Sequence, residues 1–389
     1  MPYRILTLND ISPKGLARLP RERYQVGADV SEPDAILVRS ADMHGVALAP
    51  SVRAVARAGA GFNNIPVSEL GQRGIPVFNT PGANANAVKE LVLAGLFLAA
   101  RNLLPAWLFA RSLSGDDEAI DAAVETGKKA FVGFELPGRT LGVVGLGAIG
   151  VEVANSAHVL GMKVLGYDPQ ITVQRAWQLS ANVEQALSLE DLFARADAVS
   201  VHVPLNEYTR GLVNAARLAL MKSDATILNF ARAAIVDTEA VLAALDAGRL
   251  HAYVCDFPQH ALKDHPKVVT LPHLGASTGE AEENCAIMAA EQIRDFLENG
   301  NIRNSVNYPE AVLPRMPNTT RIAIANSNVP NMVGQISTSL AGQKINIADL
   351  LNKSRGEVAY TLIDVDGEVS TSLLAAIRRI DGVLSARIV

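Results

Sequence analysis

The feature that most constrains the fold of this 389-residue sequence is a glycine fingerprint at positions 145–150. Its three glycines, Gly145, Gly147 and Gly150, have the spacing G-x-G-x-x-G and follow an apolar run at 141–144. The pattern predicts a strand that turns tightly into a helix, with one glycine for the turn, one for close approach of a ligand and one for helix packing. A pyrophosphate group would then rest on the amino terminus of that helix.

The residues after the fingerprint strengthen this interpretation. An apolar helical pattern follows Gly150, and a second strand at 163–167 leads to Asp168, 18 residues after that glycine. A carboxylate at this place accepts hydrogen bonds from both ribose hydroxyls and repels a 2′-phosphate, which favours NAD over NADP. The alternative is a packing turn without a ligand, and the strand, helix and acid together disfavour it.

Composition and charge exclude several classes of protein. Hydrophobic residues make up 49% of the chain and charged residues 19%, yet no uninterrupted apolar run approaches the ~20 residues of a membrane span. The run Leu91–Ala100 is expected to be a buried helix, and the amino terminus enters a strand-like pattern without a signal peptide, so we expect a cytoplasmic protein with no membrane partner. The net charge of −5 gives no attraction for nucleic acid, so an anionic substrate needs local arginines.

The two cysteines, Cys255 and Cys285, lie in apolar or helical contexts without C-x-x-C spacing. We therefore expect no disulfide, no zinc or other metal site and no thiol redox chemistry. Both are expected to be core or spectator thiols.

The periodicity predicts an α/β protein with two Rossmann-like, doubly wound parallel-sheet domains and a C-terminal ferredoxin-like α+β domain. A long helical pattern runs from Ala85 to Leu113, and the order β-α-β-β-α-β begins at Arg321. The expected divisions are 1–96 with 283–305 for a substrate-binding domain, 97–282 for an NAD-binding domain, 306–318 for a proline-marked linker and 319–389 for a binding or assembly domain.

Two loops of the dinucleotide domain carry residues suited to hydride-transfer chemistry. Arg232 follows the strand 225–230, and His273 lies in a proline and glycine loop after the strand 268–271. A hydroxyl that loses its proton needs a base, and histidine titrates near neutrality. The adjacent carboxylate needs a cation, and the planar fork of arginine binds it through two hydrogen bonds. If the strands run parallel, we expect both loops to face a cleft between the domains.

Over essentially the whole chain, the sequence resembles the D-isomer-specific 2-hydroxyacid dehydrogenases. The matching segments are Arg39-Ser40, Arg57–Ile65, the fingerprint with Asp168, Val201–Leu205, Asn229–Asp237 and Pro272–Thr278. The C-terminal domain is similar to an ACT regulatory domain. The resemblance implies an NAD-dependent oxidoreductase of serine biosynthesis that acts on 3-phosphoglycerate as a homodimer or homotetramer.

The resemblance also implies a role for each matching residue. His273 would be the catalytic acid and base, and Arg232 would bind the substrate carboxylate. The residues that would bind the substrate are Arg39, Ser40, Arg57, Gly59, Ala60, Gly61 and Asn84. Those that would bind the cofactor are Gly145, Gly147, Ala148, Ile149, Gly150, Asp168, Pro169, His202, Val203, Pro204, Phe230, Ala231, Asp256 and Gly275.

The sequence departs from the family pattern near both catalytic residues. A glutamate normally pairs with the catalytic histidine at a position 29 residues after the arginine, and here that position is Ala261. His260 and Asp264 are the nearest candidates for a replacement, and the sequence does not choose between them. Ala233 stands where the family commonly has glycine, and its methyl group is tolerable if φ is negative.

A third departure lies in the ACT-like domain. Relatives inhibited by serine bind it between two such domains, and Asn326, Asn328 and Asn346 match the positions of the polar residues involved. Asn331, however, replaces the loop glycine that usually follows Pro330, and its side chain is expected to crowd the loop. L-serine as an effector is therefore a hypothesis.

Two alternative functions stay open. Another D-2-hydroxyacid dehydrogenase, of the glyoxylate/hydroxypyruvate or lactate type, would use the same cofactor residues, and phosphate recognition by Arg39 and Arg57 would distinguish it. An NADH-sensing binding protein with this fold would work through partners, and the retention of His273 and Arg232 argues against it.

Overall fold

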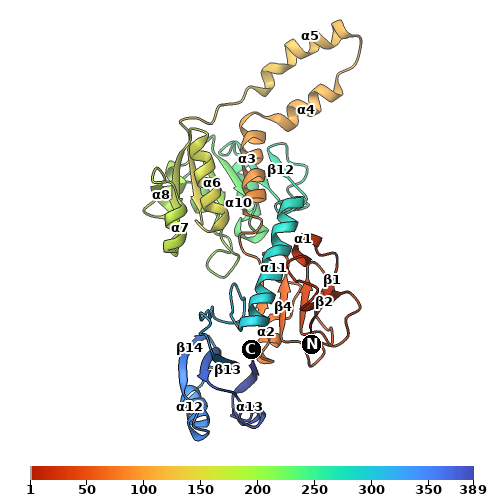
Figure 1. Cartoon of the computed structure of the whole chain (residues 1–389). Helices are drawn as coiled ribbons and strands as arrows, with labels where there is room; N and C mark the ends of the chain where they lie inside the picture. The colour runs from red at the N-terminus through yellow and green to blue at the C-terminus, as the bar shows by residue number, and fades with distance from the viewer. Residues whose placement is uncertain (1) are drawn as a thin grey trace. The chain divides into compact units, whose positions relative to one another are not determined.

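The computed structural model describes residues 2–389, which form two compact units (Figure 1). Unit 1 contains the residues up to Asn84 together with Gly279–Val389, and unit 2 is Ala85–Thr278. The chain passes from one unit to the other after Asn84 and after Thr278, and a helix starts at each of these boundaries. The sequence interpretation placed the two boundaries after residues 96 and 282. Helix α3 (Ala85–Ala100) belongs wholly to unit 2 and helix α11 (Gly279–Asn299) wholly to unit 1, since each packs along its length on one sheet.

Unit 2 is built on one parallel seven-stranded sheet with the order β12-β11-β10-β9-β6-β7-β8. The strands are β6 (Thr140–Val144), β7 (Lys163–Tyr167), β8 (Glu184–Gln185), β9 (Ala198–Val201), β10 (Thr226–Asn229), β11 (Ala252–Cys255) and β12 (Val268–Thr270). Strands β9, β10 and β11 are buried at every residue, as expected for a parallel sheet covered on both faces. The order reverses beside β6, so the predicted doubly wound fold is confirmed.

The helices that cover the two faces of this sheet are α3, α6 (Ala148–Val159), α7 (Val173–Gln178), α8 (Leu189–Arg195), α9 (Ala215–Leu218), η2 (Ala233–Ile235) and α10 (Thr238–Asp246). Three further helices of unit 2 have no buried residue and are α4 (Leu103–Ser112), α5 (Asp117–Gly127) and η1 (Lys128–Phe131). Separate cores lie on the two sides of the sheet.

The single helical pattern expected from Ala85 to Leu113 is wrong, because the chain breaks at Asn102. This residue has φ +48°, a left-handed conformation that asparagine tolerates better than most residues and that a continuous helix does not allow. Helices α4 and α5 then form a hairpin that extends from the end of α3 (Figure 1). Within residues 2–389 no single helix has the length and composition to span a membrane, and α3 and α4 pass that test only together, with a bend of 63°.

Unit 1 contains a parallel five-stranded sheet with the order β2-β1-β3-β4-β5. Its strands are β1 (Tyr3–Leu8), β2 (Tyr24–Gly27), β3 (Ala35–Val38), β4 (Ala54–Arg57) and β5 (Val77–Phe78), and its helices are α1 (Pro13–Leu16), α2 (Val67–Gln72) and α11. Apolar side chains of α11, among them Ile293 and Phe296, pack on this sheet. The second predicted α/β domain is thus present.

The C-terminal part of unit 1 is an antiparallel sheet with the order β14-β15-β13-β16 and two helices. The elements are β13 (Thr319–Ser327), α12 (Met332–Gly342), β14 (Ile347–Arg355), β15 (Val358–Asp366), α13 (Thr371–Arg378) and β16 (Val383–Ile388). Their succession is the β-α-β-β-α-β order predicted from the sequence, and it is that of a ferredoxin-like sandwich.

The two faces of this small sheet join different cores. Along β13, Ile322 and Ile324 pack with α12 and α13, whereas the alternate residues Ala323 and Ala325 join the core that contains Phe296. Because successive side chains of a strand point to opposite faces, one strand binds both layers. The C-terminal sheet is therefore part of the packing of unit 1 and not a tethered appendage.

A buried ion pair fastens the C-terminal sheet to the preceding linker. Arg321 and Asp364 are cross-strand partners on β13 and β15, both are fully buried, and two hydrogen bonds of 2.6 Å join guanidinium and carboxylate. The guanidinium also donates to the carbonyl oxygens of Asn299, Leu313 and Pro314. One arginine thus binds backbone carbonyls of α11 and the linker and the carboxylate of a neighbouring strand at once.

We predict that Arg321→Met lowers the free energy of unfolding by about 3–5 kcal/mol, because it leaves the Asp364 carboxylate buried without a counter-charge. The double variant Arg321→Met/Asp364→Leu should lose less, since no charge is then stranded. Exposed Arg379→Met serves as the control and should change stability by no more than about 0.5 kcal/mol. Urea unfolding followed by circular dichroism measures all three, and a double variant less stable than Arg321→Met would contradict this account.

Candidate active site

The predicted site residues of unit 2 lie along one edge of its sheet. The register aligns the last residues of six strands, so the carboxyl ends of these strands lie at one level. In sheet order these residues are Tyr167, Val144, Val201, Asn229, Cys255 and Thr270. The residues that follow these ends are, in order across the sheet, Asp168, Gly145, His202, Phe230, Asp256 and Leu271. Ligands of open α/β sheets bind beyond this edge, next to the reversal of strand order.

The three fingerprint glycines differ in their surroundings. Gly145 has φ +91°, and a Cβ there would lie 2.8 Å from the carbonyl oxygen of His202. A Cβ on Gly150 would lie 1.8 Å from the oxygen of Gly145, so only glycine lets α6 pack against the turn. Gly147 is different, because a Cβ there would meet no atom within 4 Å. The space beside Gly147, at the amino terminus of α6, therefore fits a dinucleotide pyrophosphate.

Asp168 lies at the mouth of a cavity of about 380 Å³. Its carboxylate accepts hydrogen bonds from the backbone N–H groups of Leu146 and Gln170, at 2.8 and 2.9 Å. Each oxygen keeps a further lone pair for a ribose hydroxyl. The cavity also has apolar walls, which fit an adenine ring: Leu146, Ile171, Leu179, Val183 and Leu187.

His202 is a half-buried, uncharged histidine beside the fingerprint turn. One ring nitrogen lies 2.8 Å from the hydroxyl of the fully buried Ser200, and burial lowers the pKa of His202 to about 4. Its backbone carbonyl packs against Gly145, and Val203 and Pro204 continue the segment. These contacts place His202 next to the fingerprint turn. Within residues 2–389, no carboxylate forms a hydrogen bond with its ring that would stabilise the protonated form.

The loop that carries His273 is held by Asp256. The buried carboxylate of Asp256, at the end of β11, accepts hydrogen bonds from the backbone N–H groups of Leu274 and Gly275 at 2.7 and 2.8 Å. His273 itself has φ +58°, which places a residue with a side chain in the left-handed region. Such a conformation persists only where the surroundings impose it, and two charge-assisted hydrogen bonds on the next two residues do so.

The imidazole of His273 is exposed and lies against an aromatic ring. Phe257 approaches it edge-on, with ring centroids 5.3 Å apart and an interplanar angle of 63°. Neither nitrogen of the imidazole forms a hydrogen bond within residues 2–389. Of the two replacements considered for the missing glutamate, Asp264 pairs with Lys263 and His260 is exposed, and neither forms a hydrogen bond with His273.

Arg232 lies in a turn shaped by a buried asparagine. The amide of Asn229, the last residue of β10, donates to the carbonyl oxygen of Arg232 at 3.0 Å and accepts from the N–H of Ala231 at 3.2 Å. The Arg232 guanidinium is exposed and donates to the carbonyl oxygen of Ala231. Ala233 is not among the residues with positive φ, so its methyl group is tolerated where relatives have glycine.

In unit 1, the predicted substrate residues also follow carboxyl ends of strands. Arg57 ends β4, and its guanidinium donates to the carbonyl oxygens of Arg39 and Gly61 at 3.0 and 2.8 Å. A Cβ on Gly59 would lie 2.5 Å from this guanidinium, so the loop 59–61 wraps closely around the arginine. Arg39 follows β3 and forms an ion pair with Glu282 in the first turn of α11.

Three further residues of the predicted substrate site are Ser40, Ala60 and Asn84. The carboxamide oxygen of Asn9, beyond β1, accepts hydrogen bonds from the backbone N–H groups of Ser40 and Ala41 and so fixes the segment after Arg39. Asn79 donates to the carbonyl oxygen of Ala60 at 2.6 Å. The side-chain oxygen of Asn84 is buried and has no hydrogen-bond partner among the described residues.

The three C-terminal asparagines have different surroundings. Asn326 is buried inside β13 and bonds to Ser327 and Thr361. Asn328 and Asn346 are exposed, and they donate to the carbonyl oxygen of Gly356 and to the carboxylate of Asp366. Asn331, which replaces a glycine, has φ +65°, a conformation that asparagine adopts more readily than most residues, and so the loop keeps a glycine-like turn.

Sequence reasoning missed the residues that position the site. Ser200, Asn229 and Phe257 contact the predicted residues in unit 2, and Asn9 and Glu282 do so in unit 1. A polar residue within an apolar strand was the available signal for Ser200 and Asn229, since a buried polar side chain needs a partner. The ion pair of Arg39 with Glu282 joins residues 243 apart in sequence, and no local pattern indicates it.

Comparisons with known proteins identify the family. The family model described as "D-isomer specific 2-hydroxyacid dehydrogenase, NAD binding domain" matches residues 106–275. The D-3-phosphoglycerate dehydrogenase of Haemophilus influenzae is 33% identical over 354 residues, which cover 87% of this chain and 82% of that protein. That of Methanocaldococcus jannaschii is 32% identical over 373 residues, covering 92% of this chain and 68% of that protein. The NAD+-bound structure of 3-phosphoglycerate dehydrogenase from Entamoeba histolytica has a TM-score of 0.61 and 25% identity, covering 79% of this chain and 99% of that one.

We predict opposite effects of alanine at two fingerprint glycines. Gly147→Ala should leave stability unchanged, because its Cβ meets no protein atom, yet weaken NADH binding about tenfold or more by occupying the space of the pyrophosphate. Gly145→Ala should instead lower the free energy of unfolding by about 1–3 kcal/mol, because φ there is +91°. NADH fluorescence titration and urea unfolding separate the two effects, and normal NADH affinity in Gly147→Ala would contradict the assignment.

Proposed function

Because this chain belongs to the D-isomer specific 2-hydroxyacid dehydrogenase family, we propose that it catalyses the NAD-dependent oxidation of 3-phospho-D-glycerate to 3-phosphohydroxypyruvate, the first step of L-serine biosynthesis. The observation that carries this proposal is the shared edge of the unit 2 sheet. There the fingerprint turn and Asp168 lie on β6 and β7, and an exposed arginine and histidine follow β10 and β12. Similar proteins of Haemophilus influenzae and Methanocaldococcus jannaschii are D-3-phosphoglycerate dehydrogenases.

In this proposal the chain's residues divide the work of a dehydrogenase. When bound, NAD+ accepts the hydride that leaves C2 of the substrate. The imidazole of His273 takes the proton of the C2 hydroxyl, and the guanidinium of Arg232 binds the adjacent carboxylate and fixes the orientation of C2. His202 stays uncharged at neutral pH, since burial lowers its pKa to about 4, and so it places no positive charge beside the cofactor turn.

The missing glutamate changes how His273 is held. With Ala261 at that position, the backbone is fixed by the Asp256 carboxylate and the ring is packed by Phe257. These contacts orient the imidazole but supply no carboxylate to stabilise its protonated form. Release of the proton to solvent from the exposed ring therefore completes the acid and base cycle.

The substrate phosphate is assigned to the arginines of unit 1. Arg39 lines a cavity of about 290 Å³ with Ser12 and Glu282, and the loop 59–61 wraps closely around the guanidinium of Arg57. Guanidinium groups and loop amides are the usual partners of phosphate and carboxylate. A phosphate that binds Arg39 would share that arginine with Glu282.

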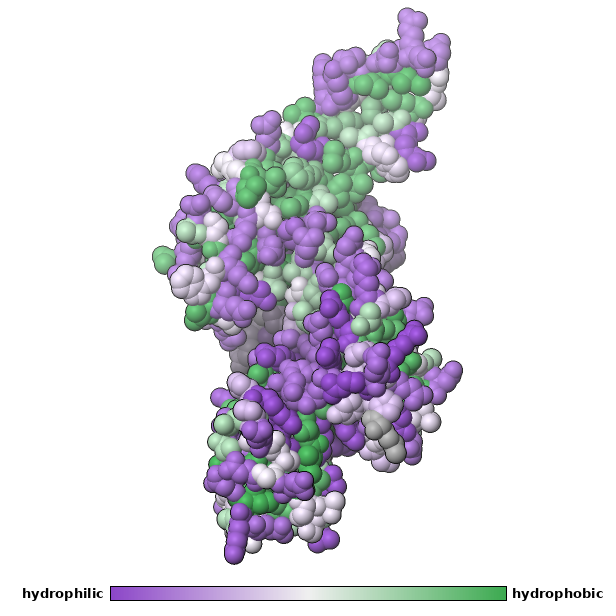
Figure 2. All heavy atoms as spheres, viewed as in Figure 1, coloured by the Kyte–Doolittle hydropathy of each residue, from purple (hydrophilic) through white to green (hydrophobic). Residues whose placement is uncertain are grey.

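The exposed apolar face of the hairpin supports a homodimer or homotetramer. Leu103, Leu104, Trp107 and Leu108 of α4 are all exposed, and apolar side chains gather on this hairpin in Figure 2. Exposed apolar patches of this kind mark protein interfaces, and we propose that a second copy of the chain packs on this one.

A reducing, cytoplasmic location is proposed as well, because it fits the two free, buried cysteines.

L-serine is proposed as an effector at the C-terminal domain. Asn328 and Asn346 are exposed and able to meet it, whereas Asn326 is buried in the sheet and would act only by shaping the site. Titration of L-serine against the initial rate of NADH formation tests this role, and inhibition of that rate is the expected result.

The direct test of the function is the formation of NADH from NAD+ and 3-phospho-D-glycerate. D-lactate and D-glycerate serve as unphosphorylated comparison substrates, and NADP+ serves as the comparison cofactor. Preferential turnover of the phosphorylated acid with NAD+ is expected. Faster turnover of D-lactate would favour the alternative dehydrogenase, and NADH binding without any turnover would favour a sensor.

We predict that His273→Asn lowers kcat by about 10²–10⁴-fold without weakening NADH binding, because the variant lacks the base but leaves the fingerprint intact. The matched control is His265→Asn, because the imidazole of His265 also belongs to unit 2 but contacts Asp246. Stopped-flow absorbance of NADH measures the step. An unchanged kcat in His273→Asn would refute the assignment of this residue.

A second prediction concerns the phosphate. Arg39→Gln should raise KM for 3-phospho-D-glycerate about tenfold or more and leave KM for D-glycerate within about twofold, since only the first substrate carries the charge that Arg39 binds. Equal effects on both substrates would show that Arg39 supports the loop and does not recognise phosphate.

A further inference from the structure

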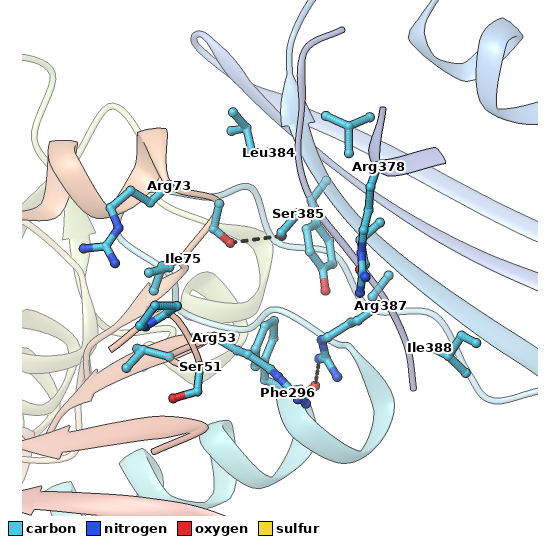
Figure 3. Close-up of a pocket in the computed structure, with 17 residues that line it drawn as sticks. Ser51, Arg53, Arg73, Ile75, Phe296, Arg378, Leu384, Ser385, Arg387 and Ile388 are labelled. Carbon is cyan, nitrogen blue, oxygen red and sulfur yellow. Dashed lines mark hydrogen bonds between the residues drawn. The ribbon is translucent and has the colours of Figure 1, made fainter. Parts of the chain in front are cut away.

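A cavity of about 610 Å³ in unit 1 is lined by four arginines (Figure 3). It lies between β16 and the segments that precede β4 and β5, with Phe296 of α11 and Tyr360 of β15 in its wall. The arginines come from four different elements of the chain and are Arg53, Arg73, Arg378 and Arg387. Among the described residues, no aspartate or glutamate lines the cavity, although the whole chain has a net charge of −5.

Carboxylates outside the cavity neutralise only half of this charge. Arg53 lies 3.3 Å from Asp34, and Arg73 lies 3.7 Å from Glu69. Both arginine side chains are partly exposed, and the Arg73–Glu69 pair is exposed on both sides, where ion pairs are weak. They leave hydrogen-bond donors available for a stronger partner.

The other two arginines donate hydrogen bonds to backbone oxygens and pair with no carboxylate among the described residues. Arg378 donates from Nε to the carbonyl oxygen of Ala386 at 2.8 Å. Arg387 donates to the carbonyl oxygens of Leu297 and Phe296 and lies over the Phe296 ring, 4.5 Å from its centroid. Neither guanidinium has an ion pair within residues 2–389.

The position of Arg387 is electrostatically unfavourable without an anion. Burial and the positive charge of Arg53 both lower the pKa of Arg387, against the opposing effect of Tyr360. Figure 3 shows the side chains of Arg53 and Arg387 approaching each other beside Phe296. A bound anion would relieve the repulsion and supply the missing counter-charge.

The size and walls of the cavity indicate more than a simple inorganic ion. Its volume lies within the ~300–1,000 Å³ range of small-molecule sites. Ile75, Leu384 and Ile388 add apolar surface between the charged groups, and Ser51 and Ser385 add hydroxyls. These features suit a carbon skeleton that carries charged ends.

This cavity is separate from the arginines assigned to the substrate. Arg53 precedes β4 and Arg57 ends it, so the two arginines lie at opposite ends of one strand. The four residues of β4 span about 13 Å. Helix α11 reaches both places, because Glu282 pairs with Arg39 near its start and Phe296 accepts a hydrogen bond from Arg387 near its end.

We propose that the four-arginine cavity binds a small organic anion with two or more negative charges, carried by carboxylate or phosphate groups, at a site distinct from the substrate site. The arginines of β16, α13 and the loops before β4 and β5 converge on it from both sheets of unit 1. A bound anion would accept hydrogen bonds from arginines on both sheets and would so link the C-terminal sheet to the parallel sheet. The proposal does not depend on the catalytic activity.

Isothermal titration of the full chain with citrate and, separately, with pyrophosphate tests the proposal and distinguishes carboxylate from phosphate chemistry. The decisive variant is Arg73→Gln/Arg378→Gln, which removes two exposed cavity arginines. Saturable binding of at least one probe to the unaltered chain is expected, with affinity reduced about tenfold or more in this variant.

Two control variants keep the result specific. Arg18→Gln/Arg379→Gln removes the same charge from exposed positions of unit 1 outside the cavity, and Arg39→Gln removes an arginine of the substrate site. Both should bind the probe within about twofold of the unaltered chain. Absence of saturable binding, or equal weakening by the cavity variant and either control, would overturn the proposal. Thermal unfolding without ligand confirms that each variant is folded.

Discussion

The carboxylate of Asp256 is the interaction on which the candidate active site depends. It is buried at the end of β11, and its two oxygens accept the N–H groups that follow His273. A buried carboxylate needs such partners, and a histidine with φ +58° needs an external restraint, so each feature explains the other. The same principle recurs one strand away, where the buried amide of Asn229 shapes the turn of Arg232. Buried polar groups at strand ends therefore present the two exposed catalytic candidates.

Arginines organise unit 1 in a comparable way. Arg321 joins the linker, α11 and two strands through a fully buried pair with Asp364, and Arg57 holds the loop after β4 through backbone oxygens. In both cases the guanidinium satisfies carbonyl groups that a loop cannot pair by itself. Arg387 has carbonyl partners as well, but it also faces another arginine across a cavity. That difference separates a structural arginine from one suited to a ligand.

Much of this architecture could be predicted from sequence because its signals are local. The glycine spacing at 145–150 specified the turn, and the apolar run at 321–325 specified strand β13. The break at Asn102 was missed because an apolar pattern continues on both sides of it, and only the backbone conformation ends the helix. The joining of the C-terminal sheet to the first domain was also missed, since it depends on contacts such as Ala323 with the core around Phe296. The partner of His273 could not be predicted, because the structure replaces a carboxylate at a fixed spacing with Phe257 and a backbone restraint.

We infer that Asp256 holds His273 in position for proton transfer, and single-turnover formation of NADH by an Asp256→Asn variant measures this dependence. An asparagine offers one acceptor oxygen and turns an N–H₂ group toward the second backbone N–H, so the loop loses one of its two restraints. At saturating NAD+, we expect this variant to form NADH from 3-phospho-D-glycerate about tenfold or more slowly than the unaltered chain. A single-turnover rate equal to that of the unaltered chain would contradict it.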